Sequence, residues 1–262
     1  MAQPFLALHQ RDEILDRLGV GQIALLCGVA HQQVVAHQPS DHFGLAGAEA
    51  EPRAQVLGNF SAEHRMIPPA ALGDIVQKER QIEHADEMGF DVYATIDHHF
   101  SQEFGISANP LALFCAAAQR AQRIRFRTAL HVLPSKNPME LAGQIAAADI
   151  ITGGRLECGV GRGHAWLYHG YGIPMEESQA RMEEAFEILI RAWTEERFPY
   201  NGRFWNVRNA RVTPRPIQKP HPPIWVGGES PRAIRRAAEL GNGWIPIGSN
   251  PDFPMGTPDQ LS

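Results

Sequence analysis

From residue 54 onward, short apolar runs alternate with longer stretches in which apolar residues recur at helical spacing. The clearest amphipathic helix lies between residues 182 and 193, where apolar side chains fall at i, i+3, i+4, i+7, i+8 and i+11. This alternation of strands and helices predicts a parallel sheet covered by helices. We expect strands at 55–60, 91–96, 124–132, 156–161, 224–226 and 244–247, and helices at 72–88, 111–121, 137–152, 182–193 and 231–240.

Residues that favour helix ends support these boundaries. Gly89 follows the first predicted helix and is typical of a C-terminal cap, and Gly241 closes the last one. Asn137 and Pro138 form a typical helix start, with Asn as N-cap and Pro in the first turn. By contrast, we expect no helix to open in the stretch 165–172, which is interrupted by glycine and aromatic residues.

The spacing of the units restricts the fold class. Residues 54–262 hold six βα-type repeats of about 35 residues each, which is the size of a βαβ unit. Two α/β architectures fit. One is an open doubly wound sheet, and the other is a TIM (β/α)₈-type barrel that is incomplete, with its C-terminal units missing. Residues 1–53 do not join this rhythm, and we expect a poorly ordered N-terminal extension there, ahead of a barrel domain at 54–262.

Composition narrows the class of protein further. The chain has 262 residues, 44% of them apolar, and a formal charge of -5 without a basic stripe, so we expect no nucleic-acid partner. Its apolar runs fall short of the ~20 residues that span a membrane, and we expect a cytoplasmic protein without membrane contact. Three separated cysteines are expected to be reduced core thiols: Cys27, Cys115 and Cys158.

Candidate functional groups follow the predicted strands, because the carboxyl ends of parallel strands meet at one edge of an α/β fold. In the segment 227–231, two glycines precede a Ser N-cap and a Pro, which would leave backbone N–H groups at a positive helix end. This pattern predicts an anion site, most simply for a phosphate. Arg162, after another strand, would add a cation.

Histidines follow two other strands. His98 and His99 are adjacent, so on an extended segment they point to opposite sides and only one can face the site. A histidine there suits proton transfer near neutral pH. The same residues, taken with Asp97 and His131, leave open a metal-dependent barrel hydrolase, although their spacing is not a strong zinc pattern.

The glycines at 159, 161 and 163 suggest a dinucleotide-binding fingerprint. The third glycine comes one position early and no helix is expected to follow, so we reject this interpretation.

Between residues 55 and 248 the chain resembles the bacterial luciferase-like flavin-dependent monooxygenases, which are (β/α)₈ barrels. No single motif decides this, but many segments agree in order and spacing. They are 58–60, 88–91, 97–100, 132–134 with 137–138, 153–156, 159–163, 200–204, 222–224 and 227–230.

The resemblance implies roles for individual residues. His98 matches the active-site histidine beside the reactive edge of the flavin, and the peptide between Ala129 and Leu130 matches a non-prolyl cis peptide against the flavin ring. We expect His99, His131 and His164 to line the substrate pocket, with no metal in the site. The remaining expected cofactor-binding residues are Gly161 and Arg162 at the flavin, and Gly228, Glu229 and Ser230 at its phosphate.

The resemblance also implies the chemistry. Reduced FMN would react with O2 to give a flavin hydroperoxide, which oxygenates a small organic substrate. Because no nicotinamide site is evident, a separate NAD(P)H-dependent flavin reductase would supply the reduced flavin. A homo-oligomer is expected. Two alternatives stay open beside the hydrolase: a deazaflavin in place of FMN, and an inactive or merely flavin-binding remnant of the family.

Overall fold

The computed structural model describes residues 34–36, 69–100 and 109–246. Several predictions fall outside these residues and stay predictions: the first strand at 55–60, the state of Cys27, and most of the proposed N-terminal extension. Within the described residues, no helix combines the length and the apolar character needed to cross a bilayer.

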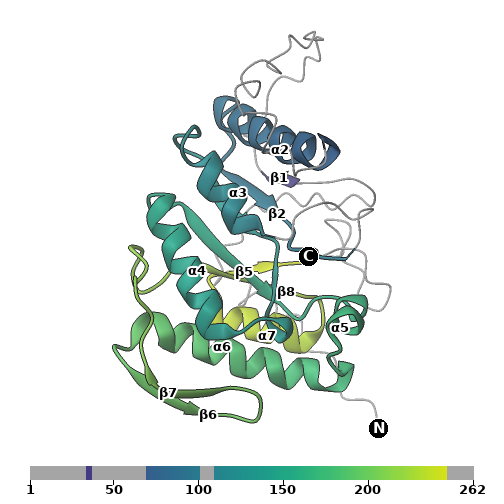
Figure 1. The fold of residues 1–262 in the computed structure, drawn as a ribbon, viewed down its shortest axis with the longest axis vertical. Helices are drawn as coiled ribbons and strands as arrows, with labels where there is room; N and C mark the ends of the chain where they lie inside the picture. Colours follow the sequence, from purple (N-terminus) through teal and green to yellow (C-terminus); the bar gives the residue numbers. More distant parts are fainter. Residues whose placement is uncertain (1–33, 37–68, 101–108, 247–262) are drawn as a thin grey trace, which may run out of the picture.

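The centre of the fold is a seven-stranded sheet that is parallel apart from its first pair (Figure 1). Strand β1 (Val34–Ala36) pairs antiparallel with β2 (Val92–Thr95). The parallel strands then follow in chain order: β3 (Arg125–Thr128), β5 (Leu156–Gly161), β8 (Ile224–Gly227) and β9 (Gly243–Ile245), with the short β4 (His131–Val132) pairing with the end of β5.

The strand order decides between the two predicted architectures. In a doubly wound sheet the order reverses at a switch point, whereas the wall of a barrel runs in one direction along the chain. The parallel strands β2, β3, β5, β8 and β9 never reverse. The fold is therefore an incomplete α/β barrel, as one of the two predictions had it.

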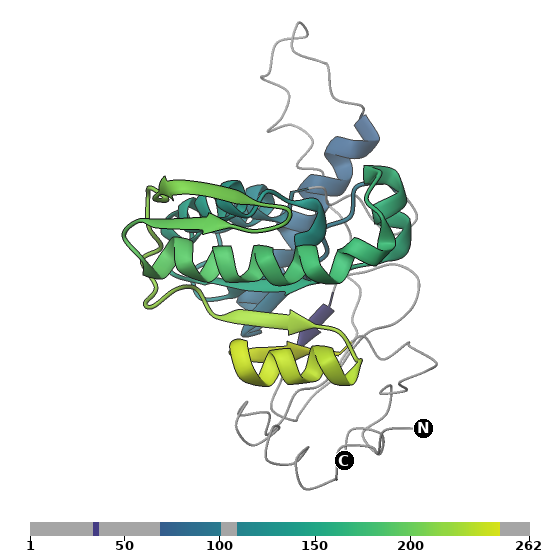
Figure 2. The ribbon, with the colours of Figure 1, turned by 90° about the horizontal axis from the view of Figure 1, so that it is seen from below.

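Helices cover this wall in the same order. They are α2 (Pro69–Glu87), α3 (Pro110–Ala117), α4 (Pro138–Ile151), α5 (Ala165–Tyr171), α6 (Ser178–Thr194) and α7 (Pro231–Leu240). Two single 3-10 turns, Leu133–Ser135 and Met175–Glu177, precede α4 and α6. Helices α2, α3, α4 and α6 contact one another in sequence, and α7 packs beside β8 and β9 (Figure 2).

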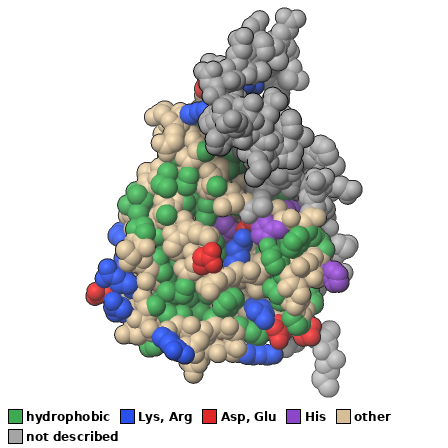
Figure 3. Space-filling model, in the orientation of Figure 1, with side chains coloured by type: hydrophobic (Ala, Val, Ile, Leu, Met, Phe, Trp, Pro, Cys, Tyr) green, Lys and Arg blue, Asp and Glu red, His purple; other side chains and the backbone are tan. Residues whose placement is uncertain are grey.

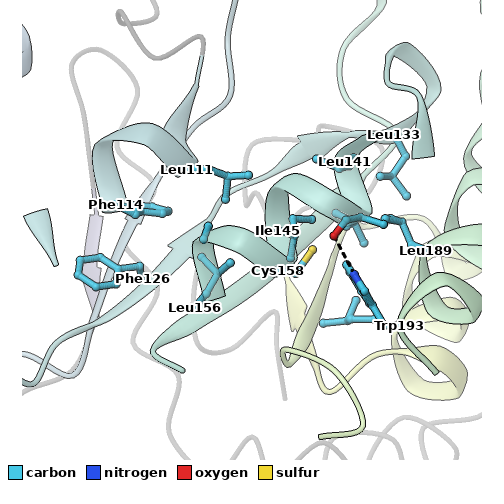
Figure 4. Close-up of a cluster of buried hydrophobic side chains, with 14 of the residues drawn as sticks. Leu111, Phe114, Phe126, Leu133, Leu141, Ile145, Leu156, Cys158, Leu189 and Trp193 are labelled. Carbon is cyan, nitrogen blue, oxygen red and sulfur yellow. Dashed lines mark hydrogen bonds between the residues drawn. The ribbon is translucent and has the colours of Figure 1, made fainter. Parts of the chain in front are cut away.

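The core lies between the strands and this helical layer (Figure 4). Phe114 of α3 and Phe126 of β3 are fully buried, with ring centroids 5.3 Å apart. Farther along, the indole N–H of Trp193 on α6 donates to the carbonyl oxygen of Ala142 on α4 at 3.0 Å. Each large apolar side chain buried here stabilises the fold by about 1.5–3 kcal/mol. Cys158 lies in this core as expected, while Cys115 is only partly buried.

The helix ends predicted from Gly89, Asn137 and Gly241 are confirmed. The Asn137 side chain accepts from the backbone N–H groups of Met139 and Glu140, which fixes the start of α4. After α2, Gly89 adopts a φ of +85°, a conformation that side chains with a Cβ rarely take. The following Phe90 N–H donates to the carbonyl oxygen of Ala85, which closes the helix.

Arg155, just before β5, forms hydrogen bonds at the C-terminal ends of two helices. Its guanidinium donates to the carbonyl oxygens of Ala118 and Ala121 after α3, and to that of Thr152 after α4. It also reaches the carbonyl of Ile124, at 3.2 Å. One side chain thus satisfies carbonyl groups that helix ends leave without intrahelical partners.

Three local predictions are wrong. The expected third strand is interrupted, because the Ala129-Leu130 peptide is cis and separates β3 from β4. The expected helix at 111–121 ends at Ala117. Helix α5 opens where no helix was expected. Its buried Leu167 and Tyr168 pack against Val132, and Gly172 closes it in the left-handed conformation, so tertiary packing outweighs weak local propensity.

An antiparallel hairpin was not predicted as strands at all. It comprises β6 (Phe198–Asn201) and β7 (Asn206–Ala210) and follows α6. Glu184 of α6 holds its turn, since the carboxylate accepts from the backbone N–H groups of Arg203, Phe204 and Trp205 at 2.8, 3.0 and 3.3 Å.

Candidate active site

The register of the sheet brings the predicted strand ends together. Thr95 lies beside Thr128, so the loops after β2 and β3 start side by side. Val160 lies beside Val226, and Gly227 beside Ile245, so the ends of β5, β8 and β9 are also neighbours. The functional segments singled out from the sequence therefore share one edge of the barrel wall.

The cis peptide places an apolar side chain on this edge. Leu130 follows the cis bond, is partly buried, and lies over glycines at the ends of two strands. A Cβ at Gly161 would come within 2.7 Å of the Leu130 Cδ1 atom, and a Cβ at Gly227 would meet its Cδ2 atom at still shorter range. The Leu130 side chain therefore occupies the space that a Cβ at either glycine would need.

The turn from β8 into α7 is the segment where the sequence predicts an anion site. Gly228 adopts a φ of +129°, its N–H donates to Ile245, and its carbonyl accepts from the Trp244 indole at 2.7 Å. The Ser230 hydroxyl caps α7 by accepting from the Ala233 N–H at 3.3 Å. Glu229 is only 4% exposed. The amino end of α7 therefore follows directly on the carboxyl end of β8, and a helix dipole favours an anion at such an end.

Arg162 and His164 lie in the next loop along the edge, after β5. Both are exposed, and Arg162 directly follows Gly161, whose strand neighbours β8. Arg162 therefore directly follows the strand next to β8, which leads into α7.

His98 packs against two aromatic rings, one from His164 in this loop and one from Trp166 at the start of α5. Its ring centroid is 5.3 Å from Trp166 and 6.0 Å from His164, both nearly edge-on. Burial and the nearby His164 and His99 lower the pKa of His98 to about 4, although Asp97 opposes the shift. His98 is therefore a neutral imidazole at neutral pH. Histidine side chains gather on the face shown in Figure 3.

Asp97 is the centre of a second cluster. Its buried carboxylate accepts from the His99 Nε2 atom at 2.6 Å, the His131 Nδ1 atom at 2.8 Å and the Lys136 ammonium at 2.8 Å. Burial alone would raise the pKa of Asp97, but the hydrogen bonds and charges of His131 and Lys136 bring it down to about 2. Burial lowers the pKa of His131, which is 2% exposed.

Residues from α5 complete the cluster. The Tyr171 hydroxyl contacts the His99 Nδ1 atom, and Phe100 packs against both rings. His99 and His131, both expected to line a substrate pocket, thus share one carboxylate. Lys136, Trp166 and Tyr171 were not anticipated. Lys136 directly precedes the helix start formed by Asn137 and Pro138, and nothing in that pattern points to a site. Trp166 and Tyr171 lie on α5, the helix that the sequence does not predict.

No metal centre is formed by this part of the chain. Within the described residues, no group of three or more His, Cys, Asp and Glu side chains is arranged to hold a metal ion. The carboxylate oxygens of Asp97 are engaged by His99, His131 and Lys136. The described residues therefore offer no ligand cluster for the metal-dependent hydrolase.

Residues 57–255 match the family model of luciferase-like monooxygenases, which is more than half of the chain. The chain belongs to this family. The resemblance seen in the sequence motifs is thereby confirmed, and so is the barrel fold that it implied.

Similar proteins of the luciferase-like family include named monooxygenases. A flavin-dependent trigonelline monooxygenase oxygenase component from Acinetobacter baylyi is 31% identical over 60% of this chain and 44% of its own length. An FMNH(2)-dependent dimethylsulfone monooxygenase from Pseudomonas putida is 29% identical over 65% and 48%. The crystal structure of monooxygenase RslO1 from Streptomyces bottropensis matches with a TM-score of 0.66 and 34% identity, covering 71% of this chain and 58% of that chain.

Other similar proteins carry names that refer to F420. The chain spans about half the length of the curated relatives that it matches.

Proposed function

We propose that this protein is a flavin-dependent monooxygenase that uses reduced FMN and O2 to oxygenate a small organic substrate. Family membership and the names of its relatives support an oxidoreductase. The observation that carries the proposal is the shared edge on which Leu130 lies over Gly161 and Gly227, directly beside the capped start of α7. This edge offers an apolar surface next to an anion site, the two environments that FMN requires.

The residues present fit the cofactor. The apolar side chain of Leu130 suits one face of the flavin ring. The α7 terminus with Gly228 and Ser230, helped by Arg162, suits the phosphate, because helix N-termini favour anions. Glu229 is buried, which agrees with a role in shaping the turn from within. A Cβ at Gly228 would meet the Cβ of Ala233 at 2.8 Å, so the turn depends on glycine.

When bound, reduced FMN supplies the two electrons with which one atom of O2 enters the substrate and the other leaves as water. His98 is the residue that we assign to the proton. As a neutral imidazole, it can accept a proton at its unprotonated ring nitrogen during the reaction. The Trp166 ring packs edge-on against His98, and both Trp166 and Leu130 pack against the buried cluster of Val132, Leu167 and Tyr168.

The partners follow from the chemistry. We propose that a separate NAD(P)H-dependent flavin reductase supplies reduced FMN, as the name of the Acinetobacter relative, an oxygenase component, supports. The substrate is a small organic molecule that approaches along the side of the edge where His164 is exposed. The similar proteins named for F420 support a second candidate, in which a deazaflavin takes the place of FMN.

Titration of the purified chain with FMN tests the cofactor site. Ser230→Asp and Ser230→Asn both keep a side chain that caps helices well, but only the first adds a negative charge beside the phosphate. We expect Ser230→Asp to weaken FMN binding about tenfold relative to Ser230→Asn, the effect of ~1.4 kcal/mol at a helix terminus. Riboflavin lacks the phosphate, so its affinity should be the same in the two variants.

Arg162→Ala should weaken FMN binding as well, whereas Arg208→Ala serves as the matched control, because Arg208 is an exposed arginine of β7 in the hairpin. A folded wild-type chain that binds neither FMN nor a deazaflavin would contradict the proposal and favour the inactive remnant. Saturable binding of a deazaflavin without FMN binding would favour the second candidate.

A further inference from the structure

Asp97 joins three separate stretches of the chain at the active-site edge. Through its two oxygens it holds His99 in its own loop, His131 in β4, and Lys136 before α4. Its side chain has no solvent exposure. Burying a carboxylate is costly unless every lone pair finds a donor, so a buried acid with one cation and two imidazole donors is a built feature of this edge.

The His98 side chain lies on the opposite side of the backbone from the side chains of Asp97 and His99. Successive side chains on an extended segment alternate between two sides. Asp97 and His99 are two residues apart and contact each other, while His98, between them, lies against Trp166 and His164. Asp97 is bonded to His131 in β4, and Asp97 and His99 lie on the same side of the backbone. His98 is therefore oriented toward the loop after β5.

The same carboxylate fixes the hydrogen positions on two imidazoles. An ionised carboxylate only accepts hydrogen bonds. The proton of neutral His99 must therefore lie on Nε2 and that of His131 on Nδ1. This leaves the His99 Nδ1 atom as the acceptor for the Tyr171 hydroxyl, in agreement with the observed contact. Lys136 places a positive charge beside the Asp97 carboxylate, at 2.8 Å.

We propose that Asp97, balanced by Lys136, is a positioning residue that fixes the orientation of His98 and the tautomers of His99 and His131. This inference rests on the proposed function for its catalytic consequence, because it assigns how the proposed proton-transfer residue is held. The orientation of His98 and the tautomers of His99 and His131 depend only on side chains of this chain, so they can be measured on the protein without cofactor.

Nitrogen-15 NMR of the histidine rings in the cofactor-free chain tests it directly, since the ring nitrogen shifts report the tautomer. Signals are assigned with His98→Gln, His99→Gln and His131→Gln. The wild type should show one tautomer each for His99 and His131, and Asp97→Asn should convert both to mixtures and move the His98 signals. Lys136→Met should do the same, while Lys136→Arg, which keeps the cation, should restore the wild-type pattern.

Asp149→Asn is the matched control for buried acidity. Asp149 of α4 is also fully buried and accepts two hydrogen bonds from Gln218, but it lies away from the active-site edge. This variant should lose stability and leave the three histidine signals unchanged. If Asp97→Asn also left them unchanged, the positioning role would be refuted.

A second readout links the positioning to the chemistry. With reduced FMN bound, Asp97→Asn should slow substrate oxygenation about tenfold or more, part of the ~10²–10⁴ that a positioned proton-transfer group contributes, while FMN affinity changes less than about threefold. If Asp97→Asn gave mixed tautomers for His99 and His131 but an unchanged oxygenation rate, the positioning would have no role in catalysis. Failure of the wild type to bind FMN would instead refute the proposed function and leave the NMR result to decide the positioning.

Discussion

The environment of His98 determines which form of the imidazole is available at the active-site edge. Desolvation and the nearby His164 and His99 act together to disfavour the charged ring, and the adjacent Asp97 only partly compensates. Because the pKa of His98 is lowered to about 4, the ring enters any reaction at neutral pH as a base rather than an acid.

His164→Ala should raise the pKa of His98 toward its ordinary value near 6.5, because it removes the neighbour with the largest opposing charge effect and admits water. NMR titration of the His98 ring between pH 3 and 8 would measure the change. His221→Ala is the control, since His221 packs against Trp193, away from this edge. A His98 pKa that fell or stayed constant in His164→Ala would show that burial alone sets it.

At the residue level, the sequence could indicate which positions follow the strands but not how their side chains pair. His98, Arg162, Gly228 and Ser230 were found because strand ends and helix caps have local patterns. The pairing of His131 with Asp97 spans 34 positions. Only the fold brings such residues together, which is why the role of Lys136 was missed.

Among the secondary-structure elements, those with strong apolar periodicity were predictable and those formed by tertiary contacts were not. Helices α4 and α6 bury one continuous face in the core, and the start of α4 carries the Asn137 cap that the sequence predicts. The hairpin of β6 and β7 is mostly exposed, so it lacks an apolar pattern. Hydrogen bonds to Glu184 of α6 stabilise the hairpin turn, and apolar packing against Val132 stabilises α5.

Glu184→Gln should loosen the hairpin. The amide keeps one acceptor oxygen but presents an NH2 group to backbone donors, so stability should fall by ~1–3 kcal/mol. Hydrogen exchange at Arg203, Phe204 and Trp205 should accelerate, and urea unfolding would give the free energy. Glu187→Gln, on the same helix but exposed and paired only with Arg191 and Tyr200, should change stability by less than about 0.5 kcal/mol. Equal effects of both substitutions would contradict this account of the turn.

Considered as a whole, the molecule should lose stability in acid. Asp97, Asp86, His98 and His131 all have lowered pKa values in the folded chain. A group with a lowered pKa binds its proton more readily when unfolded, so its contribution is complete above the unfolded pKa and disappears as the pH falls through the folded one. For the histidines this loss begins below about 6.5, and for the aspartates below about 4.

The share of Asp97 can be measured separately. Its pKa of about 2, against 3.8 unfolded, corresponds to about 2 kcal/mol at neutral pH. Asp97→Asn should therefore have a lower Tm than the wild type at pH 7 and a flatter decline of Tm between pH 4 and 2, followed by circular dichroism. Parallel Tm curves for the two proteins over that range would mean that Asp97 does not titrate with folding.

Arg155 makes two helix termini depend on one side chain. The guanidinium bonds carbonyl groups just after α3 and just after α4 at once, so fraying at either end breaks contacts that the other end also uses. Opening fluctuations at the two termini are therefore coupled into a single event, and the amino-side rim of the barrel wall behaves as one cooperative unit. A lysine, with one point charge in place of a planar fork of donors, would uncouple them.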